Sequence, residues 1–200
     1  MAGHKHIVFD VVGTLSDYQN FYQAIEDRLG ERLRRFNITS DTFGYLWIEV
    51  AEREYTYLSM SSRYVPYSSV LEAIFWRVLW KVGITNPRDL VSVEDLVAVM
   101  NGYANVSMRP GAAECIQELR DAGFTIWGFT MDNWDRVYGY FTKAGIDMPA
   151  ENLVACDDIG FCKPDPEAYK PLLQRLTVDG RKPWFAAAHE WDVSAAKRTG

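Results

Sequence analysis

The chain has 200 residues and a mass of 22.9 kDa, which suits one large domain or a core domain with an insert. Hydrophobic residues make up 48% of the sequence and charged residues 24%, a balance that excludes a disordered chain. The formal net charge of −6 leaves no basic surface to attract a phosphate backbone, so we expect no nucleic-acid partner.

The cysteines and the hydrophobic stretches indicate where the protein resides. Three cysteines are an odd number without the spacing of a zinc site, and the N-terminal residues do not read as a secretory signal. We therefore expect a reducing, cytoplasmic location. Arg77 and Lys81 interrupt the most apolar stretch, so no run reaches the roughly 18 apolar residues of a membrane span, and we expect no membrane association.

The first predicted element is a short apolar segment, residues 6–10, which ends at a glycine-containing loop. Such a segment is typical of a buried parallel strand that leads into a functional loop. The next stretch, residues 18–105, has only helical periodicity and holds much of the aromatic content. We expect residues 18–105 to form a helical cap inserted into a core made of residues 1–17 and 106–200.

Strands and helices alternate in the rest of the chain. Predicted helices cover residues 111–122, 134–144 and 166–176, and predicted strands cover residues 124–130, 152–156 and 184–188. Glycine ends the first two helices, and Asp165 followed by Pro166 begins the third. This alternation predicts an α/β fold with a Rossmann-like, doubly wound parallel sheet.

Reactive groups in such a sheet gather at the carboxyl ends of the strands. Asp10 and Thr130 each end a predicted strand, Lys163 lies in a loop, and Asp192 follows the last strand. A carboxylate acts as a covalent nucleophile when a cation keeps it ionised and hydroxyl groups orient it. Each residue alone is explained by a cap or a turn, but together with Thr14 they supply all the parts of such a site.

Four segments resemble the motifs of the haloacid dehalogenase superfamily. They are Phe9-Asp-Val-Val-Gly-Thr-Leu15, the strand-end Thr130, Lys163-Pro-Asp165 and Trp191-Asp192. The resemblance covers nearly the whole chain and is strongest to the L-2-haloacid dehalogenases. Two further segments are similar to the cap and the last motif of that branch, Glu54-Tyr-Thr-Tyr57 and His189-Glu-Trp-Asp192.

The resemblance implies a Rossmann-like core, a helical cap and hydrolysis through an aspartyl-ester intermediate. On that pattern Asp10 is the nucleophile and Lys163 stabilises it. Thr14 and Thr130 hold the oxygens of the nucleophile or the carboxylate of the substrate. Asp192 positions the lysine or the hydrolytic water.

Two departures from the superfamily pattern concern the leaving group and the metal. Phosphatases of the superfamily place an acid two residues after the nucleophile, where this chain has Val12, which has no proton to donate. Their magnesium site also uses an acidic residue at the position of Ala188. We therefore expect no metal and no cofactor, which still suits a halide leaving group because a halide needs neither.

Other departures concern the halide itself. The resembled dehalogenases place a halide-binding Arg after Leu-Trp in the first cap segment, but here Trp47 is followed by Ile48 and Glu49. The Ser and Asn of their last motif align with Ala187 and His189. Because a departing halide gains negative charge, these replacements predict an altered leaving-group pocket.

Five residues are candidates for contact with the substrate: Val12, Trp47, Glu49, Tyr169 and His189. Tyr169 falls on a position that the dehalogenases use. For Trp47 the competing interpretation is a place in the core of the cap, and for His189 a hydrogen bond to Glu190 or to a backbone carbonyl. Arg53 and Arg63 are alternative sources of a cation in the cap.

The sequence leaves three functions open. The first is a metal-independent, dehalogenase-like hydrolase that acts on a small molecule. The second is a lyase or cyclase, including one with pericyclic chemistry, that folds an apolar metabolite against the aromatic residues of the cap. The third is a binding protein without catalysis. Members of the resembled family usually continue past Gly200 with another strand and helix, so we expect a shortened sheet or an edge completed in a homodimer.

Overall fold

The computed structural model describes residues 5–200, and the contacts divide the chain into two compact units. Met1–Asp17 and Met108–Gly200 form the first, here called the core unit. Tyr18–Ser107 form the second, here called the helical unit. The second boundary thus falls two residues later than the position expected from the sequence. The two segments at which the chain passes between the units, β2 (Ser16–Asp17) and β3 (Ser107–Met108), pair with each other as a two-stranded sheet.

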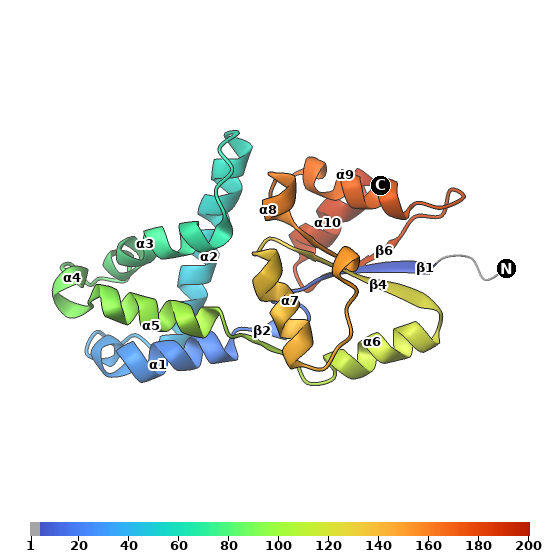
Figure 1. The fold of residues 1–200 in the computed structure, drawn as a ribbon. Coiled ribbons are helices and arrows are strands. Elements are labelled where there is room, and N and C mark those ends of the chain that lie inside the picture. Colours follow the sequence, from blue (N-terminus) through green and yellow to red (C-terminus); the bar gives the residue numbers. More distant parts are fainter. Residues whose placement is uncertain (1–4) are drawn as a thin grey trace. The chain divides into compact units, whose positions relative to one another are not determined.

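A four-stranded sheet forms the centre of the core unit (Figure 1). Its strands are β1 (Lys5–Asp10), β4 (Phe124–Thr130), β5 (Leu153–Ala155) and β6 (Trp184–Ala186), in the order β5-β4-β1-β6. All neighbouring pairs are parallel, which confirms the predicted fold class. The register places Asp10 beside Phe129, so β1 and β4 end together.

Helices cover both faces of this sheet. Figure 1 shows α6 (Ala112–Asp121) and α7 (Trp134–Lys143) on one face and α9 (Pro166–Leu176) and α10 (Glu190–Thr199) on the other. The backbone N–H of Glu167 donates to the Asp165 side chain at 2.9 Å, so the predicted cap of α9 is present. Two single turns, η1 (Ala150–Asn152) and α8 (Cys156–Ile159), flank β5 and were not predicted.

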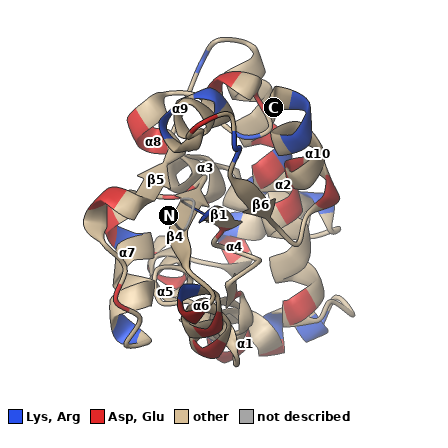
Figure 2. Ribbon diagram, turned by 90° about the vertical axis from the view of Figure 1, so that its right-hand side faces the viewer, with Lys and Arg blue, Asp and Glu red and all other residues tan. Residues whose placement is uncertain are grey.

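The middle of each strand in this sheet is free of charged residues, so the charged side chains lie at or beyond the strand ends. Figure 2 shows no charged residue along β4 or β6. Gly128 in β4 allows close packing, because a Cβ atom there would lie 2.8 Å from Leu153 Cδ1 on the neighbouring strand. Phe129, the next residue, has no exposed surface. The charged residues that follow these strands in the sequence therefore lie at the end of the sheet and not along it.

The helical unit contains α1 (Gln19–Arg34), α2 (Ser40–Met60), α3 (Tyr67–Lys81), α4 (Pro87–Leu90) and α5 (Val93–Tyr103). Its core is aromatic: the Trp47 ring lies 4.7 Å from the Phe75 ring and 5.3 Å from the Phe21 ring, between ring centroids. In the part of the chain that the structure describes, no helix is long and apolar enough to cross a membrane.

Candidate active site

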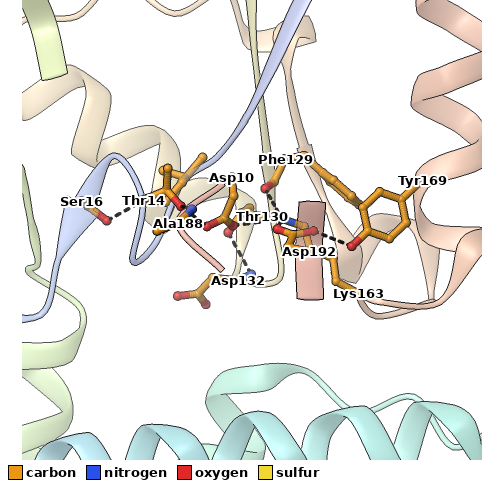
Figure 3. A network of polar contacts seen from close by, with 11 residues as sticks. Asp10, Thr14, Ser16, Phe129, Thr130, Asp132, Lys163, Tyr169, Ala188 and Asp192 are labelled. Carbon is orange, nitrogen blue, oxygen red and sulfur yellow. Dashed lines mark hydrogen bonds and ion pairs between the residues drawn. The ribbon is translucent and has the colours of Figure 1, made fainter. Parts of the chain in front are cut away.

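The Asp10 carboxylate lies at the end of β1 with both oxygens engaged (Figure 3). Thr14 Oγ1 donates to Asp10 Oδ2 at 2.7 Å, and Lys163 Nζ donates to Asp10 Oδ1 at 2.9 Å. The Asp10 side chain is 8% exposed. A hydroxyl and an ammonium thus orient a carboxylate that is almost dry, which is the arrangement expected of an anionic nucleophile.

Lys163 is fully buried and each of its three donors has a partner. Besides Asp10, its Nζ donates to the Phe129 carbonyl at 2.9 Å and to Asp192 Oδ2 at 2.8 Å. Burial by itself lowers the pKa of Lys163, but the carboxylates of Asp10 and Asp192 outweigh burial and raise the pKa above its ordinary value. The ammonium therefore keeps its charge at neutral pH.

Asp192 lies in the first turn of α10 and has no exposed surface. Lys163 donates to one of its oxygens, and the Tyr169 hydroxyl donates to the other. Burial raises the pKa of Asp192, against the lowering effect of Lys163. Burial also raises the pKa of Tyr169, and the nearby Asp192 carboxylate adds to this effect, so the phenol keeps its proton and acts as a donor.

Thr14 is held in place by a tight loop after β1. Gly13 adopts a φ of +92°, a conformation that favours glycine, and the backbone N–H groups of Leu15 and Ser16 both donate to the Val11 carbonyl. On the far side, the backbone N–H of Ala188 donates to Thr14 Oγ1 at 2.9 Å. The hydroxyl therefore accepts from Ala188 and gives its own proton to Asp10.

A second ion pair follows the end of β4 and was not predicted from the sequence. The backbone N–H of Asp132 donates to Thr130 Oγ1 at 3.1 Å, and the Asp132 carboxylate pairs with Arg136 in the first turn of α7 (Figure 3 shows Thr130 and Asp132). The sequence signal that could have indicated this pair is Asp132 itself, an acidic residue two positions after Thr130, which ends the strand. Thr130 itself is 1% exposed and belongs to the same polar network.

The residues of this site do not fit a magnesium ion. The Lys163 ammonium lies within 2.9 Å of an oxygen of each carboxylate, where a cation between Asp10 and Asp192 would have to lie. Ala188 contributes a methyl group instead of a carboxylate. Over residues 5–200, no group of three or more His, Cys, Asp or Glu side chains is placed to hold a metal. The balance of two carboxylates to one ammonium favours nucleophilic chemistry by a carboxylate.

Three of the five candidate substrate contacts belong to the core unit. Val12 is half-buried in the loop after Asp10, and Tyr169 joins the network through Asp192. His189 occupies the N-cap position of α10 without a capping hydrogen bond from its side chain, and its ring stacks on Trp191 with 5.6 Å between centroids.

The other two candidates belong to the helical unit. Trp47 has no exposed surface, and its Nε1–H donates to the Leu71 carbonyl at 2.8 Å, which supports a place in the core of that unit. Glu49 is exposed on α2, whereas its neighbour Ile48 is 3% exposed. Only position 49 of this pair has room for a long charged side chain that reaches solvent.

Comparison with known proteins gives a consistent result. A family model for haloacid dehalogenase-like hydrolases matches residues 4–200. An (S)-2-haloacid dehalogenase 4A from Burkholderia cepacia is 22% identical over 96% of this chain and 78% of its own length.

Solved structures show the same fold. A dehalogenase in an intermediate complex matches with a TM-score of 0.80 at 20% identity, over 100% of this chain and 83% of that chain. The L-2-haloacid dehalogenase from Xanthobacter autotrophicus with chloropropionic acid covalently bound matches with a TM-score of 0.78 at 22% identity, over 98% of this chain and 75% of that chain.

Proposed function

The chain belongs to the haloacid dehalogenase-like hydrolases, and from that membership we propose that it hydrolyses its substrate without a metal, through an ester formed on Asp10. The observation that carries this proposal is the pair of contacts on the Asp10 carboxylate, from Lys163 at 2.9 Å and from Thr14 at 2.7 Å. These contacts hold the carboxylate in one orientation beside a positive charge, which is what a covalent nucleophile requires.

The proposed reaction has two steps. In the first, an oxygen of Asp10 attacks the substrate carbon, and the bond from that carbon to the leaving group breaks as the leaving group departs with its electron pair. In the second, water attacks the carboxyl carbon of the Asp10 ester, which releases the alcohol product and a proton and restores the carboxylate. Lys163 offsets the negative charge on Asp10, and Asp192 with Tyr169 holds the ammonium in position.

We further propose a small organic acid with a halide or a related leaving group as the substrate, because relatives are named 2-haloacid dehalogenases and one solved relative carries chloropropionic acid. We also propose that the leaving-group pocket lacks the cation that the resemblance implies at this point of the chain. Ile48 is buried within the helical unit and Glu49 is an exposed carboxylate, so neither supplies a cation to a departing anion. Small 2-haloacids are therefore slow substrates of this protein.

A change at position 49 tests this pocket. Glu49→Arg introduces an exposed cation, and the rate of halide release from 2-chloropropionate should rise tenfold to thousandfold, on the order expected of one well-placed donor. Glu72→Arg, at an exposed position of α3, makes the same change of charge and should leave the rate unchanged. Fast halide release by the unmodified protein would show that another residue already serves as the halide site.

The ester itself is tested by a single turnover in water enriched in oxygen-18, with enzyme in excess over 2-chloropropionate. Hydrolysis at the Asp10 carboxyl carbon places the label on Asp10, where mass spectrometry of the peptide detects it, and leaves the first product unlabelled. Product that carries the label beside an unlabelled Asp10 would eliminate the ester and with it this function.

The lyase or cyclase alternative stays a prediction from the sequence. Among the aromatic residues of the helical unit, Tyr57 and Trp80 are each 60% exposed, whereas four others are buried in its core: Trp47, Tyr55, Tyr67 and Phe75. Within the helical unit they serve to pack its helices against one another.

We also propose that the helical unit acts as a cap and that the protein works in the cytoplasm on a small molecule. The three cysteines, Cys115, Cys156 and Cys162, are free thiols, which suits a reducing compartment. A homodimer stays a prediction from the sequence.

A further inference from the structure

Arg109 contacts three consecutive carbonyls of the loop that carries Thr14. Its backbone N–H donates to the Leu15 carbonyl at 2.8 Å. Its guanidinium donates to the other two, from Nε to the Thr14 carbonyl at 3.1 Å and from an Nη to the Gly13 carbonyl at 3.1 Å. We call these three contacts the Arg109 clamp. Arg109 lies about 95 positions after its partners in the chain, so the clamp exists only in the folded protein.

The clamped loop is the one that orients the nucleophile. Thr14 lies in it, donates to Asp10 Oδ2 at 2.7 Å and accepts from the Ala188 N–H at 2.9 Å. A displacement of the Thr14 carbonyl moves the Thr14 Cα atom and therefore its hydroxyl. Backbone hydrogen bonds close this loop from within, and Arg109 adds the contact that ties its carbonyls to a distant part of the chain.

The chemistry of arginine suits this task. The planar guanidinium presents two parallel donors at a fixed spacing, and two adjacent carbonyls of a turn match that spacing, whereas a lysine ammonium is a single point of contact. Arg109 also follows directly after β3, which pairs with β2, and β2 follows directly after the clamped loop. Arg109 is therefore connected to the loop in two ways, directly through its hydrogen bonds and along the chain through the paired strands β2 and β3.

We propose that Arg109 is a positioning residue, which holds Thr14 against the nucleophile and couples the Asp10 loop to the paired strands through which the chain enters and leaves the helical unit. The link to catalysis rests on the proposed function of Asp10. The clamp itself is tested without any substrate.

Amide hydrogen exchange of Ala188 reports the position of Thr14 directly. In Arg109→Ala the Ala188 amide should exchange about fivefold to tenfold faster, as expected when about one hydrogen bond is lost. Arg120→Ala is the matched control, because Arg120 also donates to a backbone carbonyl of the core unit, that of Asp147, and it precedes the start of β4 rather than the end. Adding Arg109→Ala to Thr14→Ala should change Ala188 exchange no further. Equal exchange in Arg109→Ala and the unmodified protein would overturn the proposal.

Kinetics separate positioning from a general loss of stability. In Arg109→Ala the maximal single-turnover rate with 2-chloropropionate should fall on the order of tenfold to hundredfold, while the substrate concentration at half-maximal rate stays constant. Arg109→Lys should recover part of the rate. The double variant Thr14→Ala/Arg109→Ala should be no slower than Thr14→Ala. A double variant that is slower by the full product of the single effects would show that Arg109 does not act through Thr14.

The two proposals fail in different ways. If Asp10→Asn releases chloride as fast as the unmodified protein, the proposed function is wrong, and Ala188 exchange still decides whether Arg109 holds Thr14. If the ester forms on Asp10 but Arg109→Ala leaves both its rate and Ala188 exchange unchanged, the function stands and the positioning role is wrong.

Discussion

Each unit holds a buried carboxylate within a cluster of charges, and the two clusters have opposite balances. In the helical unit, the Asp95 carboxylate pairs with Arg28 at 2.5 Å and with Arg32 at 2.7 Å, and it also accepts from the backbone N–H of Ser92 in a capping box. In the core unit, the single ammonium of Lys163 lies between the carboxylates of Asp10 and Asp192.

The balance of charge decides what each cluster does. Two guanidinium groups surround Asp95, with the hydrogen bond from Arg32 as the largest effect, and lower its pKa from 3.8 to about 2. Such a carboxylate is too well stabilised to react and serves to join α1 to α5. In the core unit two carboxylates share the one buried ammonium of Lys163, so negative charge is in excess there. We propose that the carboxylate of Asp10 is therefore available for chemistry. If Asp10 is the nucleophile, as we propose, then an excess of carboxylates, more than burial alone, distinguishes its cluster from that of Asp95.

Removing the proposed nucleophile gives the largest expected effect. Asp10→Asn should lower the rate of ester formation by 10⁴-fold or more, on the order seen when a covalent nucleophile is removed, because an amide does not attack carbon. The fold should persist, since Lys163 keeps its contacts with Asp192 and Phe129. Halide release and circular dichroism measure the two effects. A variant that stays active would place the nucleophile elsewhere.

Removing the shared cation should be the most damaging change to stability. Lys163→Met leaves two buried carboxylates without a compensating cation, although Thr14 and Tyr169 still donate to them, and should lower the free energy of unfolding by about 3 to 5 kcal/mol. Because protonation removes the repulsion, the loss should be smaller at pH 5 than at pH 8, consistent with the raised pKa of Asp192. Urea denaturation at both pH values measures this. An equal loss of unfolding free energy at the two pH values would contradict an excess of negative charge around Lys163.

Removing the structural carboxylate should act on stability alone. Asp95→Ala loses the cap of α5 and leaves two guanidinium groups facing each other, and should lower the free energy of unfolding by about 1 to 3 kcal/mol. Asp95 belongs to no part of the proposed site, so the single-turnover rate should match that of the unmodified protein. A large loss of rate in a folded variant would show that the two clusters are not separate in function.

Acid should weaken the helical unit through the same residue. The folded pKa of Asp95, about 2, lies below its ordinary value of 3.8, so its contribution to stability is complete above about pH 4 and is lost as the pH falls through 2. The full contribution is about 2 kcal/mol. Urea denaturation between pH 5 and pH 2 should show this loss in the unmodified protein and a shallower slope in Asp95→Asn. Parallel slopes would remove Asp95 as the cause.

The alternation of strands and helices, and the residues that end the strands, could be predicted from local patterns in the sequence. The helix over Pro166–Leu176 follows from a capping Asp165 and a leading proline, and the strand over Phe124–Thr130 from a short apolar run before a polar break. These signals depend only on residues close together in the sequence, so they can be recognised without knowledge of the fold. The meeting of Asp10 with Lys163 follows from parallel strands, whose carboxyl ends share one edge.

Tertiary structure alone decided the contacts that orient these groups. The Arg109 clamp joins residues about 95 positions apart, and the partners of Thr14 and Lys163 include the Ala188 N–H and the Phe129 carbonyl. Backbone donors and acceptors are the same at nearly every residue, so no side-chain pattern marks the one that is used. Trp47 shows the same limit, because an aromatic residue on a helix suits a core or a binding wall equally well until its neighbours are known.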